Sequence, residues 1–92
     1  MLESKIEKRL KREVEKISGL CLKFTSPGMS GVPDRLVLLP KGRIYFVELK
    51  AQRKTLRPLQ IKRKEQLENL GFKVYVIDSY KKIDRFIQEV IA

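Results

Sequence analysis

The sequence contains no histidine and only one cysteine, Cys21, among its 92 residues. Without histidine, imidazole cannot act as a base or nucleophile, and zinc sites built on histidine are excluded. A lone cysteine cannot form a disulfide within the chain, so we expect a cytoplasmic setting in which Cys21 is a small core residue. Any hydrolytic chemistry must therefore come from carboxylates, lysine and a hard metal ion.

Long hydrophobic runs are also missing from the sequence. No apolar run approaches the roughly 18–20 residues of a membrane span, and no signal-peptide pattern opens the chain. We therefore expect no membrane association. A chain of 92 residues is near the lower end of independently stable sizes, so residues 1–92 are expected to form one domain that oligomerisation would help to stabilise.

Positive charge is abundant. The 21 lysine and arginine residues outnumber the 11 acidic residues, which gives a net charge of +10 and a pI near 10.0. This balance favours a polyanionic partner, either a nucleic acid or an acidic membrane surface.

The hydrophobic pattern of the first half predicts a helix followed by three strands. Apolar residues recur at helical spacing over residues 2–18, and Ser18 and Gly19 end this helix. Residues 20–25 alternate as a strand does, and residues 26–33 are a loop rich in glycine and proline. Residues 34–39 and 44–50 are predicted to pair as a hairpin around a tight turn at residues 40–43.

The second half predicts a helix, a strand and a last helix. After a basic connection at residues 51–57, Pro58 suits the first turn of a helix that runs to about residue 70 and stops at Gly71. Residues 72–77 form a short buried strand, and Asp78 or Ser79 can cap the final helix. The order α-β-β-β-α-β-α predicts an α/β fold with a mixed sheet flanked by helices.

Glu48 and Lys50 stand at the end of an apolar strand, where charged side chains are costly unless something holds them. An acid-x-lysine triplet is weak as a motif, because a chain of this composition contains roughly one or two by chance, and Glu3-Ser4-Lys5 also matches. The hairpin supplies further context. If residues whose numbers sum to about 83 face each other, Asp34 lies opposite about Leu49, beside Glu48 and Lys50.

Two carboxylates at this distance repel each other and raise one pKa unless a cation lies between them. Carboxylate oxygens together with a main-chain carbonyl suit Mg²⁺ or Mn²⁺, hard ions that keep water molecules for a phosphate to replace. The residues therefore predict a Mg²⁺ or Mn²⁺ site. The simpler alternative is an ion-pair ladder across the hairpin.

The segments "PD" at 33–34 and "ELK" at 48–50 resemble the PD-(D/E)xK signature of restriction-endonuclease-like nucleases. The stretch "GVPDRLVLLPKGRIYFVELKAQ", followed by Gln60 and "GFKVYVIDS" at 71–79, is similar to the VRR-NUC (virus-type replication-repair nuclease) family. The resemblance covers nearly the whole chain from Glu3. It implies a restriction-endonuclease-like core and a metal-dependent nuclease of a bacterial or phage-infected cell.

The resemblance also implies roles for the matching residues. Asp34 and Glu48 are expected to ligate the metal, with the Leu49 carbonyl as a third protein ligand. Lys50 is expected to position or activate the attacking water, and Gln60 to orient water or phosphate. The expected products carry a 5′-phosphate and a 3′-hydroxyl.

Glu3 matches an acidic residue of the family on the first helix. A helical wheel places Glu3 inside the sector spanned by Leu2 and Val14, so it should point toward the sheet, as should Glu13. Glu7 falls just outside this sector. The alternative for Glu3 is the ordinary preference of acids for a first helical turn.

Five basic residues are candidates for contact with the DNA backbone. They are Lys23, Arg35, Arg53, Lys54 and Arg57. The loop at residues 26–31 is expected to be flexible and to contact the substrate. A solvated loop is the alternative in both cases.

The sequence shows no separate DNA-reading module, so structure-selective cleavage is favoured over cleavage of a defined sequence. We expect an endonuclease that acts on branched DNA, most naturally a four-way (Holliday) junction, as a homodimer with two active sites. The second or the last helix is a candidate dimer interface. Alternatives are a flap-type or non-selective DNA nuclease, a non-catalytic DNA-binding protein on the same fold and, more weakly, binding to RNA or acidic membranes.

Overall fold

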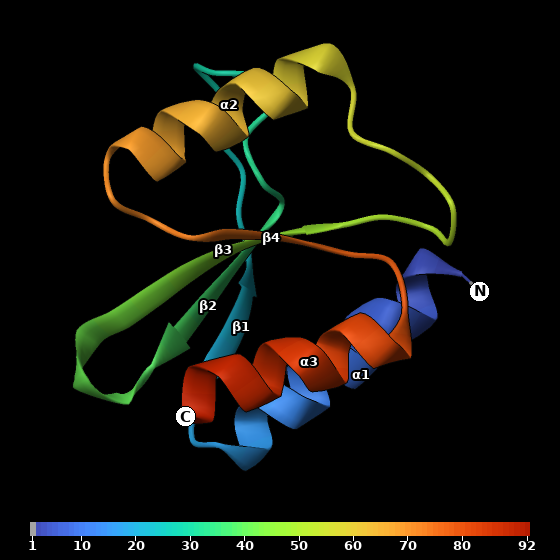
Figure 1. Cartoon of the computed structure of the whole chain (residues 1–92), viewed down its shortest axis with the longest axis vertical. Helices are drawn as coiled ribbons and strands as arrows, with labels where there is room; N and C mark the ends of the chain where they lie inside the picture. Colours follow the sequence, from blue (N-terminus) through green and yellow to red (C-terminus); the bar gives the residue numbers. More distant parts are fainter. Residues whose placement is uncertain (1) are drawn as a thin grey trace.

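The computed structural model describes residues 2–92, which form one mixed sheet with helices on both faces (Figure 1). In chain order the elements are α1 (Glu3–Lys16), β1 (Leu20–Lys23), β2 (Arg35–Leu39), the 3-10 turn η1 (Pro40–Gly42), β3 (Arg43–Leu49), α2 (Pro58–Asn69), β4 (Val74–Ile77) and α3 (Tyr80–Ile91). The strands lie in the order β1-β2-β3-β4; the first two pairs are antiparallel, and β4 runs parallel to β3. The predicted order and the mixed sheet are confirmed.

Helices α1 and α3 lie side by side against one face of the sheet and enclose the hydrophobic core (Figure 1). The three buried residues of α1, Ile6, Leu10 and Val14, recur every four residues, which places them on one side of the helix. The buried face of β2 consists of alternate residues, because successive side chains of a strand point to opposite faces. The core comprises Ile6, Leu10, Val14, Val37, Leu39, Val47, Leu49, Ile77, Ile83, Phe86 and Val90.

Helix α2 lies on the other face and covers it only in part (Figure 1). Its only buried residue is Gln60, a polar one, so hydrophobic burial does little to hold this helix. Pro58 occupies its first turn, and Gly71, with φ of +97°, follows its end. Above the strands, T-shaped ring contacts connect Phe46 with Phe24 and Phe72 at 6.0 and 5.4 Å.

The turn between β2 and β3 sets the register of the hairpin. Lys41 and Gly42 both adopt positive φ, at 70° and 71°, so that three residues close the turn and Leu39 pairs with Arg43. Arg35 consequently pairs with Val47, and the pairing lies one place earlier than the sequence predicted. This shift brings Asp34 level with Glu48, so both are on the same face of the sheet.

Several elements are shorter than predicted. Helix α1 ends at Lys16 because the chain turns at Ser18, whose φ is 67°. Strand β1 ends at Lys23, although the Phe24 amide still donates to the Asp34 carbonyl at 2.8 Å.

Ser79 caps α3, since its hydroxyl accepts from the Lys82 amide at 3.2 Å.

Cys21 is partly buried and packs against the core, as the sequence predicted, and burial raises the pKa of its thiol to about 11. None of the helices within residues 2–92 has both the length and the hydropathy needed to cross a membrane.

Candidate active site

The hairpin brings three charged side chains to one end of the sheet. Asp34 directly precedes β2, Glu48 lies near the end of β3, and Lys50 follows that strand. In an antiparallel pair the start of one strand lies beside the end of the other. The Leu49 amide donates to Asp34 Oδ1 at 3.1 Å, which fastens the carboxylate of one strand to the backbone of the next.

These side chains open into one cavity of about 630 Å³. Its walls come from the start of α1, the loop before β2, the end of β3, the connection at residues 51–57 and the start of α2. The lining residues are Glu3, Gly31, Val32, Asp34, Glu48, Leu49, Lys50, Ala51, Lys54, Thr55, Arg57 and Gln60. All five residues predicted to be catalytic therefore line a single cavity.

Glu48 is only 7% exposed, and two side chains approach its carboxylate. Gln60 Nε2 donates to Glu48 Oε2 at 3.0 Å, and Lys50 Nζ lies 3.8 Å from the same oxygen. Gln60 Oε1 accepts from the Arg57 amide at 2.9 Å and thereby caps α2. One buried glutamine thus connects the start of α2 with the carboxylate of β3.

The pKa of the Glu48 carboxyl is raised by its surroundings. Burial raises the pKa of its carboxyl to about 7, the charge of Asp34 adds to the increase, and Lys50 opposes it. The charge of Glu3 raises the pKa further. Two further acids, Asp34 and Glu3, therefore add negative charge near one partly dehydrated carboxyl, and a cation bound there would relieve the repulsion.

Arg35 occupies a different environment from the exposed position expected of a DNA contact. Its side chain is 10% exposed and forms an ion pair with Glu7 of α1. Its Nη1 lies 3.1 Å from Asp34 Oδ2 and donates to the Asp34 carbonyl at 2.9 Å. Arg35 therefore fixes Asp34 to α1. Strand alternation could have revealed this, because Arg35 shares the buried face of β2 with Val37 and Leu39.

On α1, the helical wheel did not anticipate which acid contacts the sheet. Glu3 lines the cavity as expected, although its side chain is exposed. Glu7, placed outside the inward sector, is the residue that reaches the sheet and pairs with Arg35. Glu13, placed inside that sector, pairs instead with Lys16 at 2.9 Å. The long glutamate side chain and the position of its partner decide these contacts, and neither is part of a helical wheel.

The remaining basic candidates differ in position. Lys54 and Arg57 are exposed and line the cavity, and Arg53 is exposed in the same connection with φ of 69°. Lys23 is exposed on β1, paired with Arg35 in the sheet, but outside the cavity lining. Three of the five candidates therefore lie in the segment that borders the cavity.

The loop before β2 contributes Gly31 and Val32 to the cavity. Gly31 has φ of +84°, and a Cβ there would come within 2.8 Å of Leu59, so α2 and this loop approach each other closely. Arg63 Nε donates to the Ser30 carbonyl at 2.8 Å and ties the loop to α2. Sequence reasoning missed Thr55 in the cavity wall, for which no local signal exists.

Within residues 2–92, no group of three or more His, Cys, Asp or Glu side chains converges closely enough to hold a metal ion. The donors available at the candidate site are therefore the carboxylates of Asp34 and Glu48 and main-chain oxygen. Two carboxylates with room for water match the way in which Mg²⁺ is usually bound.

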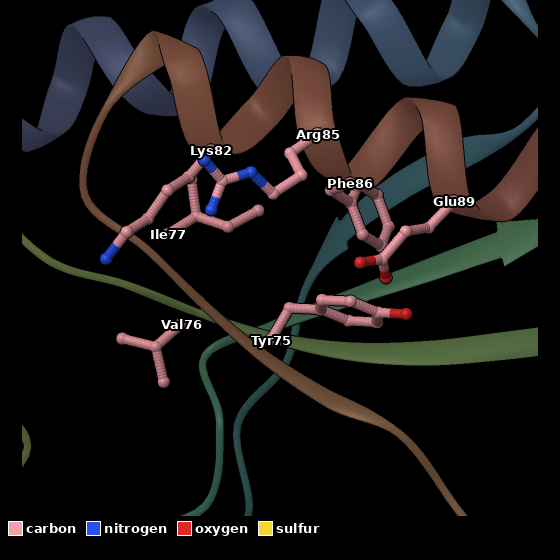
Figure 2. Close-up of a pocket in the computed structure, with 7 residues that line it drawn as sticks. All are labelled: Tyr75, Val76, Ile77, Lys82, Arg85, Phe86 and Glu89. Carbon is pink, nitrogen blue, oxygen red and sulfur yellow. The ribbon is translucent and has the colours of Figure 1, made fainter.

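A smaller cavity of about 210 Å³ lies between β4 and α3 and shares no lining residue with the cavity of Asp34 and Glu48 (Figure 2). Tyr75 and Phe86 form its apolar wall, with ring centroids 4.7 Å apart. Glu89 points toward the Tyr75 hydroxyl, and burial together with this hydrogen bond raises the pKa of Tyr75 to about 12. Lys82 and Arg85 also line this cavity, and none of the residues predicted to be catalytic lies in it.

Comparisons with known proteins are consistent with this geometry. A scan against models of protein families found no match. The chain is 52% identical over 77 residues to a protein of Acyrthosiphon pisum secondary endosymbiont phage 1 described as "Putative nuclease p44", covering 84% of this chain and 83% of that protein. A solved structure described as "VRR_NUC domain" superposes with a TM-score of 0.88 at 37% identity, covering 94% of both chains.

Proposed function

The chain belongs to the VRR-NUC family, and on this premise we propose that it is a metal-dependent endonuclease that hydrolyses phosphodiester bonds in DNA. One observation carries the proposal. Asp34, Glu48 and Lys50 converge at one end of a hairpin, in a cavity large enough to admit a phosphodiester, with Glu48 held by Gln60.

The residues at the site fit a hard divalent cation. Asp34 and Glu48, with the Leu49 carbonyl, would hold Mg²⁺ or Mn²⁺. Burial first, and then the charge of Asp34, raise the pKa of Glu48, and a bound cation would offset both effects. When bound, such an ion polarises a phosphate and lowers the pKa of a coordinated water. Hydrogen bonds already orient the two carboxylates: the Leu49 backbone amide donates to Asp34, and the Gln60 side chain donates to Glu48.

Lys50 is the residue to which we assign charge stabilisation and orientation of the attacking water. Its side chain is only 16% exposed and points at Glu48 Oε2 from 3.8 Å, so its ammonium is fixed beside the expected position of the phosphate. Gln60, buried between α2 and Glu48, positions the carboxylate. Glu3 completes the acidic wall from α1.

For the substrate, the border of the cavity favours a nucleic-acid backbone. Lys54 and Arg57 are exposed cations in its wall, and Arg53 lies in the same segment. A backbone that places one phosphate beside Glu48 must pass this segment. We propose contacts of these three residues with the DNA strands, and a further one of Lys23 at the edge of the sheet. Arg35 is assigned instead to holding Asp34.

We further propose that two copies act together on branched DNA, with a four-way junction as the favoured substrate. Among residues 2–92, the strand register places cross-strand rows of apolar residues on the sheet face away from α1 and α3, the face on which α2 lies (Figure 1). Leu20, Leu22 and Ile44 remain 55%, 42% and 43% exposed there. A two-fold axis through this open sheet face would bury it against itself and present two cavities to one substrate.

The test is cleavage of labelled four-way junction, 5′-flap, duplex and single-stranded DNA in Mg²⁺, Mn²⁺ or EDTA. We expect paired symmetric cuts in the junction, lost in EDTA and reduced about 10²–10³-fold or more in Lys50→Ala. Lys73→Ala removes an exposed lysine outside the cavity and serves as the matched control. Binding without cleavage in every metal would show a non-catalytic DNA-binding protein, and preferred cutting of flap or duplex DNA would refute the junction preference.

A further inference from the structure

A second concave surface lies on the outer side of α1, apart from the catalytic cavity. It is a cavity of about 300 Å³ lined by Lys5, Lys8, Arg9, Arg12 and Tyr80. The four α1 residues are all cationic, and no acid is among the residues that line it. We call these five residues the α1 basic pocket.

The cations of this pocket differ in how they are held. Arg9 is fixed, because it pairs with Asp84 at 3.3 Å and stacks over the Tyr80 ring at 4.8 Å. Its Nε is nevertheless buried without a hydrogen-bond partner. A buried donor without a partner is unfavourable, and Arg35 Nε, outside this pocket, is in the same condition.

The other cations have little local compensation. Within the described residues, Lys5 and Lys8 have no acid within salt-bridge distance, and Arg12 has only its neighbour Glu13, at 3.9 Å. A solvated helix face would place similar cations on a convex surface, where they repel one another least. Here they surround a hollow together with Tyr80, and the concentrated positive charge suits a compact anion.

The α1 basic pocket is close enough to the catalytic cavity for one duplex arm to reach both. Glu3 lines that cavity, and with a rise of about 1.5 Å per residue Lys8 and Arg12 lie roughly 8 and 14 Å further along the α1 axis. A duplex carries one phosphate per about 1.7 Å of its axis, counting both strands, so a phosphate falls within this span whenever another is at the cut site.

We propose that the α1 basic pocket binds a backbone phosphate of the DNA arm that flanks the scissile bond. This inference rests on the proposed nuclease function. It adds a second contact to the one proposed at residues 51–57. Held at two points, the arm would be fixed in direction with respect to the active site. The contact is independent of sequence, since only phosphate is recognised.

A matched pair of double variants tests the pocket. Lys8→Gln with Arg12→Gln removes two charges from it, and Lys41→Gln with Lys73→Gln removes two exposed charges from the hairpin turn and the connection before β4. Both proteins have the same net charge, so a general effect of charge cancels. Circular dichroism verifies folding, and affinity for a four-way junction is measured in EDTA at several salt concentrations.

We expect the pocket variant to reduce the slope of log K against log salt by roughly 1–2, and the affinity about tenfold, while the control variant changes both far less. In cleavage assays KM should rise and kcat at saturating DNA should stay the same. Equal losses in the two variants overturn the inference, and so does an unchanged slope in the pocket variant.

Cleavage by the unaltered protein separates this inference from the proposed function. If the protein cuts DNA but the two double variants bind alike, the nuclease assignment stands and the pocket does not bind phosphate. If no DNA is cut in any metal while only the pocket variant loses its salt-dependent affinity, the pocket stands and the catalytic assignment fails.

Discussion

The two faces of the sheet are built on different principles. The face under α1 and α3 is a close-packed apolar core in which Val37, Val47 and Ile83 have no exposed surface. The face under α2 carries Glu48 and Gln60 and leaves Leu20 more than half exposed. The packed face therefore provides most of the folding stability. The other face can consequently contain buried charges, which are unfavourable for folding, and exposed apolar residues.

Helix α2 shows the consequence most clearly. A helix normally attaches itself to a domain by a stripe of buried apolar residues. Here Gln60 is its only buried residue, and that residue bonds Glu48. The Arg63 bond to Ser30 provides a second attachment. We interpret α2 as a wall of the candidate active site more than as a part of the core.

The largest expected effect contrasts apolar truncations on the two faces. Phe86→Ala, on the packed face, should lower the free energy of unfolding by about 3–5 kcal/mol, because it removes a buried ring and leaves a cavity in the core. Leu20→Ala, on the open face, should change it by only about 0.5 kcal/mol. Urea unfolding followed by circular dichroism measures both, and equal losses would show that the faces contribute alike.

The next effect concerns the charge buried on the open face. Because the pKa of Glu48 is raised from 4.5 to about 7 in the folded protein, the folded state prefers the protonated carboxyl. The stability that Glu48 contributes is therefore fully present below pH 4.5, and it is lost as the pH rises through about 7. Without metal, Glu48→Gln should therefore be about 2 kcal/mol more stable than the parent at pH 8, less than full conversion of the shift because the cavity admits water.

Thermal unfolding in EDTA across this pH range provides the measurement. The two proteins should unfold together near pH 4 and diverge as the pH increases. Added Mg²⁺ or Mn²⁺ should stabilise the parent and have little effect on Glu48→Gln, which should also lose cleavage. A variant less stable than its parent at pH 8 would contradict the buried, repelled state of this carboxyl.

Most of the fold was predictable because its signals are local and periodic. The four-residue recurrence of Ile6, Leu10 and Val14 and the stop at Gly71 fix elements without reference to the rest of the chain. The ends were less accurate, since the limits of a strand depend on its hydrogen-bonded neighbours: β4 begins two residues later than predicted. The hairpin register was missed by one place because positive φ at Lys41 closes a shorter turn.

For the site, the sequence identified residues but not their partners. Motif and resemblance led to Asp34, Glu48, Lys50 and Gln60, and all four line one cavity. The Gln60 bond to Glu48 depends on where α2 docks, which no local pattern encodes. The ion pair between Glu7 and Arg35 likewise depends on how α1 crosses β2, so a charged residue that looked like a DNA contact is an internal support.

A smaller effect on catalysis is expected at Arg35, which lies on the packed face of the sheet and contacts Asp34 at the active site. Arg35→Lys should lose the joint contact with Glu7 and Asp34 and reduce kcat about tenfold by releasing the Asp34 carboxylate. Arg43→Lys is the matched control, since Arg43 Nη1 donates to the Val90 carbonyl at 2.6 Å and Arg43 does not line the catalytic cavity. The positioning role also predicts a weaker apparent affinity for Mn²⁺ in Arg35→Lys alone. A tenfold loss in both variants, or in neither, would contradict it.

The smallest effect on folding should accompany a large effect on assembly. Leu20→Gln with Ile44→Gln alters two half-exposed residues on the open sheet face, so monomer stability should change by only about 0.5 kcal/mol. If the open face joins two copies, sedimentation should show the double variant as a monomer at concentrations where the parent is a dimer. Ile91→Gln, on α3 and 52% exposed, should leave association unchanged. The opposite result would move the interface to the last helix and make the packed face the site of assembly as well as of stability.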